Sequence, residues 1–534
     1  MKKVVKKAAA IVLAAVMAVG TMTGCGGNGG SGASKNGKTI EIHAQTNGLG
    51  QAWLNNAAKA YEAETGTSVN VLFDAYLSAN LTTTLENQSL EVADLYFAQT
   101  YEWGQWTYNG YVADLTEFMD EKGEDGKSLN ERMTSTMRYV VEDDGTQTQS
   151  IVPLTKAPTG LAYNKEMMSY LCHDVLGWEE GHDYPVNTKE LYEVIGAMEK
   201  VTTEGSKDEM FTYEQSGQTL DVKPFVWSGS TGMLEFLTFA WLYQYLGIEG
   251  MTAFYNQYEN CDMYNDEAFY QVYQTVVDLL KLEEDTNGNY ISATSIPNCV
   301  SYNHTASQQQ LLLGKALMCP TGSWFYSEMK ETITDDDAWG FMPVPYMSDE
   351  TGNPITADGV EMPKNEDGSY ANYTYMNIPD YFVIPTRSEN QEAAKDFLRF
   401  IFSEEYMPIL QTDLQAPLCF EFDDAKVEKT AWFNDVANLV NVSTTADVFT
   451  GNLMQIYGKI GYYYNPDTAP FSRLSQSGFG SSNKLIDSAT GKQISSASEA
   501  TGVAVTENVY KYVQGNYKTA LTKWNEAVRL VEGR

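Results

Sequence analysis

The chain has 534 residues, of which 43% are hydrophobic and 12% aromatic, and its formal net charge at pH 7 is −36. This length exceeds what one hydrophobic core supports, so we expect two or more folded domains. The negative charge repels phosphates and anionic headgroups, which argues against nucleic acid as a partner and against membrane contact beyond an anchor. We interpret the acidity itself as a solubility feature.

The N-terminus has the order of a secretion signal. Four lysines precede an uncharged apolar run over 8–19, which is shorter than the about 20 residues of a transmembrane helix. Met-Thr-Gly-Cys at 22–25 resembles the lipobox of bacterial lipoproteins, so we predict removal of signal peptide 1–24 and lipidation of Cys25, with palmitate among its acyl chains. The alternative is an ordinary signal peptide with Cys25 as a bystander. Residues 25–38, rich in Gly, Ser and Asn, would tether the body to the extracellular face of the cell membrane.

Enzyme and metal motifs are weak in this sequence. None of the four histidines has the zinc-hydrolase spacing His-Glu-x-x-His, and no Gly-x-Ser-x-Gly elbow occurs. Residues 32–39 match a phosphate-binding loop in spelling, but they lie in the tether and lead into a strand. Residues 285–289 resemble a calcium loop without its glycine at position six. We therefore predict no cofactor, no metal and no catalytic residue.

Five cysteines follow Cys25, at positions 172, 261, 299, 319 and 419. An odd number at scattered spacings does not predict a disulfide framework. Inert buried thiols are the preferred interpretation, and a single bridge is the alternative.

The body begins with a βαβ pattern. Residues 39–45 read as a strand, a helix with Leu54, Ala57, Ala58 and Tyr61 on one face follows, and further strands are expected at 69–73 and 94–98. This pattern predicts an α/β fold with a parallel sheet. Ligands of such sheets bind beyond the carboxyl ends of the strands. The candidate ligand-binding residues at these ends are Gln45, Thr46, Asn47, Gln99 and Thr100.

Several short motifs in order along the chain resemble one family: the family 1 extracellular solute-binding proteins of bacterial ABC sugar importers, which include maltodextrin-binding proteins. The motifs are Ala-Tyr-Glu-Ala-Glu-Thr-Gly at 60–66 and the segments 93–97, 110–115, 160–165, 313–318, 322–324, 341–345 and 393–403. In the last segment, Ala394, Phe397, Leu398 and Ile401 are expected to be core, behind a capping box of Ser388 and Gln391.

The resemblance implies a two-lobed periplasmic-binding-protein-like fold of type II, hinged, with the ligand in the cleft between the lobes. Lobe 1 would comprise 39–155 and 378–418, and lobe 2 would comprise 156–377 and 419–534. Residues 345–370 and 475–501 depart from the compact pattern and are expected to be surface excursions.

Aromatic side chains are the candidate sugar contacts, because aromatic rings pack on the apolar faces of a pyranose while polar side chains bond its hydroxyls. For any one aromatic residue the core is the commoner place. By the resemblance Trp324 is the best candidate, followed by Tyr464 and its neighbour Tyr463, which precede a turn. Trp227 ends an apolar run, where a site and the core are equally favoured.

The expected crossovers between the lobes supply further candidates. Lys156 falls in the first crossover, and Asp380 and Tyr381 fall in the return, so all three should line the cleft beside the hinge. Many sugar-binding relatives have a glycine pair at that return, where this chain has Pro379-Asp380.

The predicted function follows from the resemblance. We expect a monomeric binding protein, not an enzyme, that captures an oligosaccharide and delivers it to the permease subunits of an ABC transporter. One alternative is the same scaffold binding a peptide, polyamine or metal complex. The alternative of another class is a secreted glycosidase, which needs two carboxylates about 5 to 10 Å apart across the cleft.

Overall fold

The computed structural model describes residues 39–445, with gaps at 101, 124, 135–139, 142–146, 204–208, 229–232, 256–265, 285–289, 298, 378–379 and 443. The predicted signal peptide, Cys25, the tether, Tyr463, Tyr464 and the segment 475–501 lie outside the described residues.

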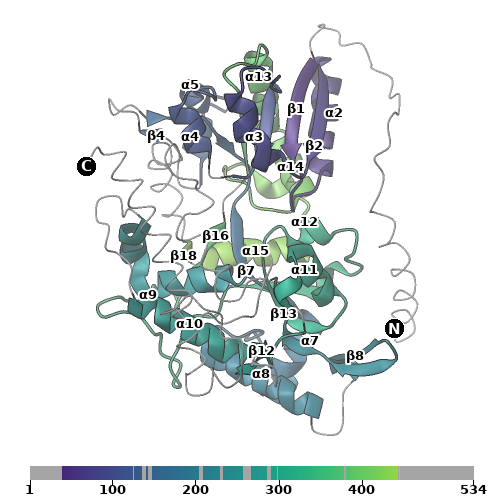
Figure 1. The fold of residues 1–534 in the computed structure, drawn as a ribbon, viewed down its shortest axis with the longest axis vertical. Coiled ribbons are helices and arrows are strands. Elements are labelled where there is room, and N and C mark those ends of the chain that lie inside the picture. Colours follow the sequence, from purple (N-terminus) through teal and green to yellow (C-terminus); the bar gives the residue numbers. More distant parts are fainter. Residues whose placement is uncertain are drawn as a thin grey trace.

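The first lobe is built on a five-stranded sheet with the order β2-β1-β3-β17-β6 (Figure 1). Its strands are β1 (Thr39–Gln45), β2 (Ser68–Asp74), β3 (Leu95–Ala98), β6 (Val152–Pro153) and β17 (Tyr381–Val383). β1 runs parallel to β2 and β3, which confirms the predicted βαβ start of the chain. β17 comes from far along the sequence and runs antiparallel to both β3 and β6.

Helices cover both faces of this sheet. They are α2 (Ala52–Thr65), α3 (Leu77–Glu86), α4 (Trp103–Tyr108), α5 (Thr116–Asp120), α6 (Leu129–Arg132), α13 (Gln391–Ile401) and α14 (Met407–Leu414). α2, α13 and α14 share a core with Leu95 and Phe97 of β3, while α3 and α4 share one with Tyr96 and Ala98 on the opposite face. α2 buries the predicted apolar stripe and ends at Gly66, whose φ of 74° suits a residue without a side chain.

Helix α13 also buries the apolar residues that its spacing predicted, namely Ala394, Phe397, Leu398 and Ile401. The predicted capping box at its start is wrong. The N-cap is Asn390, without a side-chain cap. Ser388 Oγ instead donates a hydrogen bond to Asp94 Oδ1 at 2.8 Å, so this hydroxyl joins the start of the helix to the residue before β3.

The second lobe has a sheet of order β10-β13-β7-β14, with β16 paired to the start of β7. Its strands are β7 (Ala157–Asn164), β10 (Lys223–Phe225), β13 (Ala316–Gly322), β14 (Trp339–Met342) and β16 (Met376–Asn377). β10 runs parallel to β13, whereas β7 is antiparallel to β13 and β14, so this sheet is mixed, as the first one is. The helices are α7 (Lys165–Ser169), the π-helical η2 (Tyr170–Val175), α8 (Thr188–Thr203), α9 (Glu235–Tyr255), α10 (Asp266–Leu280), α11 (His304–Leu312), α12 (Phe325–Met329) and α15 (Ala431–Val442).

Short elements complete the fold. They are the strand pairs β4 (Val140–Val141) with β5 (Gln147–Thr148), β8 (Thr212–Gln215) with β9 (Gln218–Asp221), β11 (Leu282–Glu284) with β12 (Tyr290–Ser292) and β15 (Tyr373–Thr374) with β18 (Thr444–Thr445), and the 3₁₀ turns η3 (Glu209–Phe211), η4 (Cys299–Ser301), η5 (Asp336–Ala338) and η6 (Asp424–Lys426).

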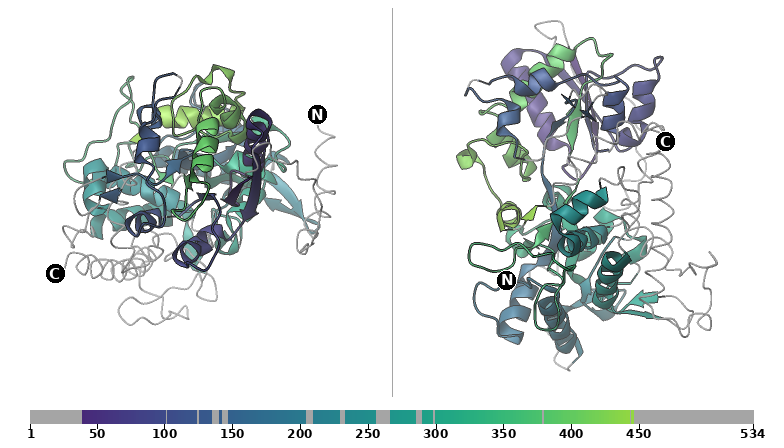
Figure 2. Two further views of the ribbon diagram at one scale, coloured as in Figure 1. Left: turned by 90° about the horizontal axis from the view of Figure 1, so that it is seen from above. Right: turned by 90° about the vertical axis from the view of Figure 1, so that its left-hand side faces the viewer.

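The chain crosses between the lobes in segments that lie side by side, and Figure 1 and the right-hand view of Figure 2 show one lobe above the other. Lys156 N donates to Pro417 O at 2.7 Å, and Leu154 N donates to Asp380 O at 2.9 Å. Cys419 N donates to Leu154 O at 3.0 Å. Cys419 and Phe420 still pack in the core of the first lobe, two residues beyond the boundary expected at 418.

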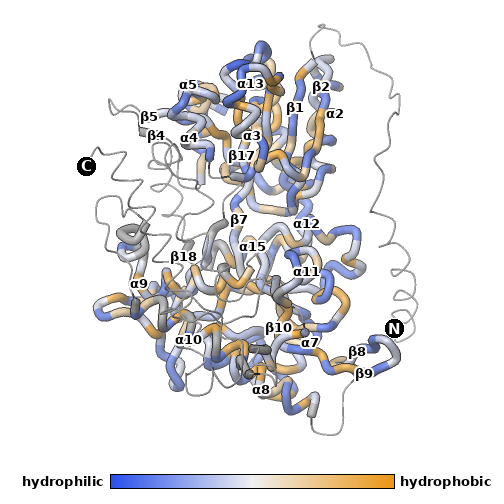
Figure 3. The backbone as a smooth tube through the Cα atoms, viewed as in Figure 1, coloured by the Kyte–Doolittle hydropathy of each residue, from blue (hydrophilic) through white to orange (hydrophobic). Residues whose placement is uncertain are grey.

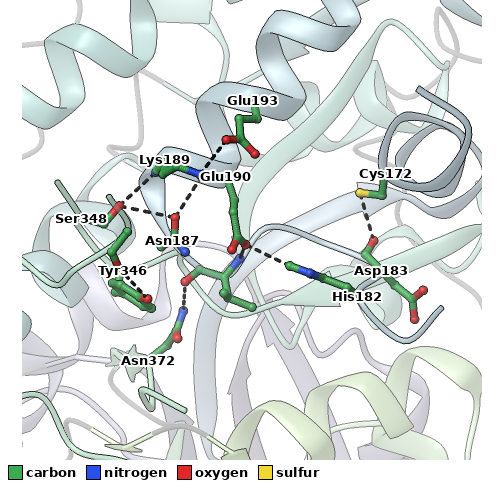
Figure 4. A network of polar contacts seen from close by, with 12 residues as sticks. Cys172, His182, Asp183, Asn187, Lys189, Glu190, Glu193, Tyr346, Ser348 and Asn372 are labelled. Carbon is green, nitrogen blue, oxygen red and sulfur yellow. Dashed lines mark hydrogen bonds and ion pairs between the residues drawn. The ribbon is translucent and has the colours of Figure 1, made fainter. Parts of the chain in front are cut away.

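The excursion expected at 345–370 is fastened to the second lobe. Trp241 Nε1 donates to Pro345 O at 2.8 Å, and Gln244 Nε2 donates to Met347 O at 2.7 Å. A polar network joins the same segment to the start of α8 (Figure 4): Lys189 N donates to Ser348 Oγ at 3.1 Å. Tyr346, Met347 and Met362 are buried, so the segment is partly core rather than wholly surface.

The cysteines that the structure describes are buried, namely Cys172, Cys299, Cys319 and Cys419. Burial raises the pKa of the Cys172, Cys299 and Cys319 thiols to about 12. The prediction of inert thiols is thus confirmed at these positions, and Cys261 lies outside the described residues. In Figure 3 apolar and polar stretches alternate along both lobes, and none of the described helices is long and apolar enough to cross a membrane.

Candidate functional site

Trp324 lies where the two lobes meet. It stands directly before α12 of the second lobe, is half-buried, and packs against the cores of both lobes. Its ring touches the loop after β1 so closely that a Cβ on Gly48 would lie 2.8 Å from Trp324 Cδ1. Nearby, Ser327 Oγ of α12 donates to Leu414 O of α14 at 2.6 Å, which joins the lobes a second time.

The sequence before Trp324 fixes the position of its ring. A Cβ on Gly322 would lie 2.1 Å from Trp324 Cζ3, so the indole folds back over a residue that must be glycine. Phe236 of α9 meets the indole edge to face, with ring centroids 5.7 Å apart and planes at 73°. Phe236 in turn stacks on Tyr375, and Tyr375 stacks on Phe239 at 4.7 Å. The indole therefore stands at the end of a row of packed aromatic rings.

The hydrogen-bonded pair Asn47 and Asp380 is the polar counterpart, in the first lobe, of Trp324 in the second. Asn47 Nδ2 donates to Asp380 Oδ1 at 2.5 Å, and Asn47 Oδ1 accepts from Leu49 N at 3.1 Å. Asp380 is only 4% exposed. Burial raises the pKa of its carboxyl to about 7, and the hydrogen bond from Asn47 acts in the opposite direction. The pair joins the loop after β1 to the return crossover.

The other predicted residues at the strand ends have mixed surroundings. Gln99 is exposed at the end of β3, and Thr100 Oγ1 donates to Glu102 Oε2 at 3.4 Å. Gln45 uses its side-chain amide on the backbone of the next turn, where Nε2 donates to Ala75 O at 2.8 Å and Oε1 accepts from Ser78 N at 2.8 Å. These contacts make Gln45 a support of the turn.

At the crossovers, Lys156 is half-buried and Tyr381 is fully buried. Tyr381 Oη donates to Thr100 O at 2.8 Å, so this tyrosine fixes the end of β3 from within the core. Trp227 is 4% exposed and donates from Nε1 to Ser295 Oγ at 3.1 Å, which favours the core alternative for this residue.

The sequence of residues 43–408, more than half of the chain, matches the family described as bacterial extracellular solute-binding protein. The chain belongs to this family. Its members bind solutes, so this solute-binding protein is not an enzyme. No protein among the curated ones matches the sequence.

Solved structures resemble this solute-binding protein over nearly its whole length at low identity. They include the GacH receptor of Streptomyces glaucescens, solved unliganded and with acarbose (13% identity, TM-score 0.55, covering 91% of this chain and 98% of that one). A chitin oligosaccharide binding protein has 12% identity and a TM-score of 0.56, with 91% and 99% covered. MalE of Bdellovibrio bacteriovorus bound to maltotriose has 14% identity and a TM-score of 0.52, with 90% and 99% covered. These likenesses establish the two-lobed α/β fold.

Sequence reasoning missed Gly48, Phe236 and Tyr375 of this solute-binding protein. Phe236 and Phe239, three residues apart on α9, read as ordinary core aromatics, and only the fold shows that their row ends at Trp324. Within the part of the chain that the structure describes, no cluster of three or more His, Cys, Asp or Glu side chains could hold a metal ion.

Proposed function

We propose that this solute-binding protein captures an oligosaccharide between its two lobes and delivers it to the permease subunits of an ABC transporter. The observation that carries the proposal is Trp324, a half-buried indole held against Gly48 of the opposite lobe. The neighbours in fold add support, because the names of three of them refer to acarbose, chitin oligosaccharide and maltotriose.

The side chains around this position suit a sugar. A pyranose presents C–H groups on its faces and hydroxyls around its rim, so it needs a flat apolar plate beside hydrogen-bonding groups. We expect Trp324 to offer the plate and Asn47, Asp380, Gln99 and Lys156 to supply the polar groups. The aromatic row behind Trp324 keeps the plate rigid, which lowers the entropy lost on binding.

The mechanism is a shift of population between open and closed arrangements of the lobes. A ligand that touches both lobes favours the closed arrangement by its differential affinity, and the hydrogen-bonded crossovers serve as the hinge. The closed monomer then docks on the permease. A lipid on Cys25 would hold the protein at the extracellular face of the membrane, with 25–38 as tether.

A thermal-shift series tests the ligand class. The purified chain is melted with malto-, xylo-, manno- and galacto-oligosaccharides and chitotriose, beside peptide and polyamine controls. A ligand at about a hundred times its dissociation constant stabilises the native state by ~2.7 kcal/mol. We expect a rise with one glycan series that Trp324→Ala abolishes.

The matched control for that series is Leu313→Ala, an exposed residue of the second lobe that should keep the shift. A rise with only a peptide or polyamine would contradict the sugar proposal and favour the same scaffold with another solute. Hydrolysis of an oligosaccharide would point to the glycosidase alternative.

A further inference from the structure

Tyr76 is an exposed aromatic residue at the edge of the first lobe where the parallel strands β1, β2 and β3 end. It lies just after β2 and is 72% exposed, more than any other exposed large hydrophobic residue in the described part of the chain. A single exposed aromatic residue carries little by itself. Its place carries the argument, because β2 ends at Asp74, which pairs with Gln45 at the end of β1.

The turn that presents Tyr76 is held from three strand ends. Tyr76 N donates to Asp74 Oδ1 at 2.8 Å, within the turn. Gln45, at the end of β1, donates to Ala75 O and accepts from Ser78 N, both at 2.8 Å. Gln99 N, beyond the end of β3, donates to Ser78 Oγ at 3.3 Å. The backbone beneath the exposed ring is therefore fixed, although the ring itself faces water.

The same edge carries the contact with the second lobe. Thr46 N donates to Asp74 O at 3.1 Å, so the loop after β1 runs beside the turn of Tyr76. Two residues on, Gly48 touches Trp324 of the second lobe, and Asn47 bonds Asp380. The turn that carries Tyr76 is thus linked, through the loop after β1, to the contact between Gly48 and Trp324.

The geometry points to Tyr76 as a sugar-binding plate supplied by the first lobe, with Gln45 as its positioning residue. This inference rests on the proposed function. The phenol ring packs on the C–H face of a pyranose unit, and its hydroxyl bonds the rim. With Trp324 as the plate of the second lobe, two aromatic rings from different lobes favour a ligand of at least two sugar units. Gln45 acts through the turn rather than on the ligand.

The test is titration calorimetry of the full chain with maltotriose and chitotriose. Tyr76→Ala should weaken binding by about tenfold or more, because an aromatic contact is lost, while Tyr76→Phe stays within about threefold. Gln45→Ala should weaken binding when Tyr76 is present. Added to the Tyr76→Ala variant, it should cause no further loss of affinity. The control is Leu72→Ala, which changes an exposed residue of β2 four positions before Tyr76 and should bind as the unaltered chain does.

Equal affinity of Tyr76→Ala and the unaltered chain would overturn this inference alone. An equal loss from Gln45→Ala in both backgrounds would overturn its positioning role and show that the amide contacts the ligand itself. No binding of either sugar by the unaltered chain, with a thermal shift from a peptide or polyamine, would overturn the proposed function and the inference with it.

Discussion

The two lobes build their sides of the inter-lobe region in different ways. On the first lobe, loops after the strands are fixed by hydrogen bonds from Gln45 and between Asn47 and Asp380. On the second lobe, Trp324 is fixed by packing on Gly322 and Phe236. The first side should respond to the protonation of Asp380, and the second side should respond to changes in side-chain volume within the aromatic row. The two sides can therefore be perturbed separately.

The largest expected effect concerns the polar side, at Asp380. Its folded pKa is raised to about 7 by burial, well above that of an exposed aspartate. Between about pH 4 and 7 the unfolded chain releases this proton and the folded chain keeps it. The carboxyl of Asp380 therefore lowers the free energy of unfolding as pH rises through this range, and above pH 7 the whole of this destabilisation is present.

Asp380→Asn keeps an acceptor for Asn47 and cannot ionise. We expect it to raise the free energy of unfolding at pH 8 by up to about 4 kcal/mol, with little change near pH 4, in urea titrations at both pH values. The control is Asp174→Asn, which removes an exposed carboxylate and should leave the free energy of unfolding at pH 8 nearly unchanged. An equal effect of Asp380→Asn at both pH values would contradict a buried, partly neutral carboxyl.

The next effect concerns the contact between the sides, at Gly48. The methyl group of Gly48→Ala would lie 2.8 Å from the Trp324 ring, so the ring or the loop must move. Overpacking of this kind costs about 1–3 kcal/mol, and we expect sugar affinity to fall about tenfold or more in calorimetry. Gly196→Ala, in open space on α8, is the control and should bind normally. Unchanged sugar affinity of Gly48→Ala would contradict the proposal that Trp324 is part of the binding site.

The packed row itself is tested at Phe236. Phe236→Leu removes the edge contact with Trp324, and an aromatic pair is worth about 0.5–1.5 kcal/mol, so affinity should fall about three- to tenfold. Phe239→Leu is the matched control, because it removes a stack on Tyr375 and leaves the edge contact between Phe236 and Trp324 in place. If both variants lose the same affinity, the row acts through the general stability of the second lobe.

The smallest effect concerns His304, which pairs with Glu328 of α12 at 2.9 Å. The hydrogen bond to Glu328 raises the pKa of His304, against the opposing effect of burial. A raised histidine pKa adds stability that is complete below its unfolded pKa and is lost as pH rises through the folded value. His304→Gln should therefore lower the free energy of unfolding by up to about 1 kcal/mol at pH 5.5 and by nearly nothing at pH 8.5. A larger loss at pH 8.5 would contradict this pairing.

Local patterns in the sequence predicted much of the first lobe. The strand at 39–45 and the apolar stripe of α2 are properties of neighbouring residues, and both were confirmed. These patterns also locate the ends of β1 and β3. The rule that ligands bind beyond the carboxyl ends of strands then predicts which residues lie near the ligand.

The remaining features depend on partners far away in the chain. Asn47 bonds a residue 333 positions later, and Ser388 bonds Asp94 instead of capping its own helix. Gln45 stands at the predicted edge, but its amide holds a turn, which no spacing reveals. The aromatic row behind Trp324 joins α9 to the segment before β16, so it exists only once the second lobe has folded.

A crystal structure of the chain with the glycan that gives the largest thermal shift tests the central claim most directly. The account predicts one sugar ring stacked on the indole of Trp324 and hydroxyls bonded to polar residues of the first lobe. A glycan bound away from Trp324, or held by one lobe alone, would contradict it.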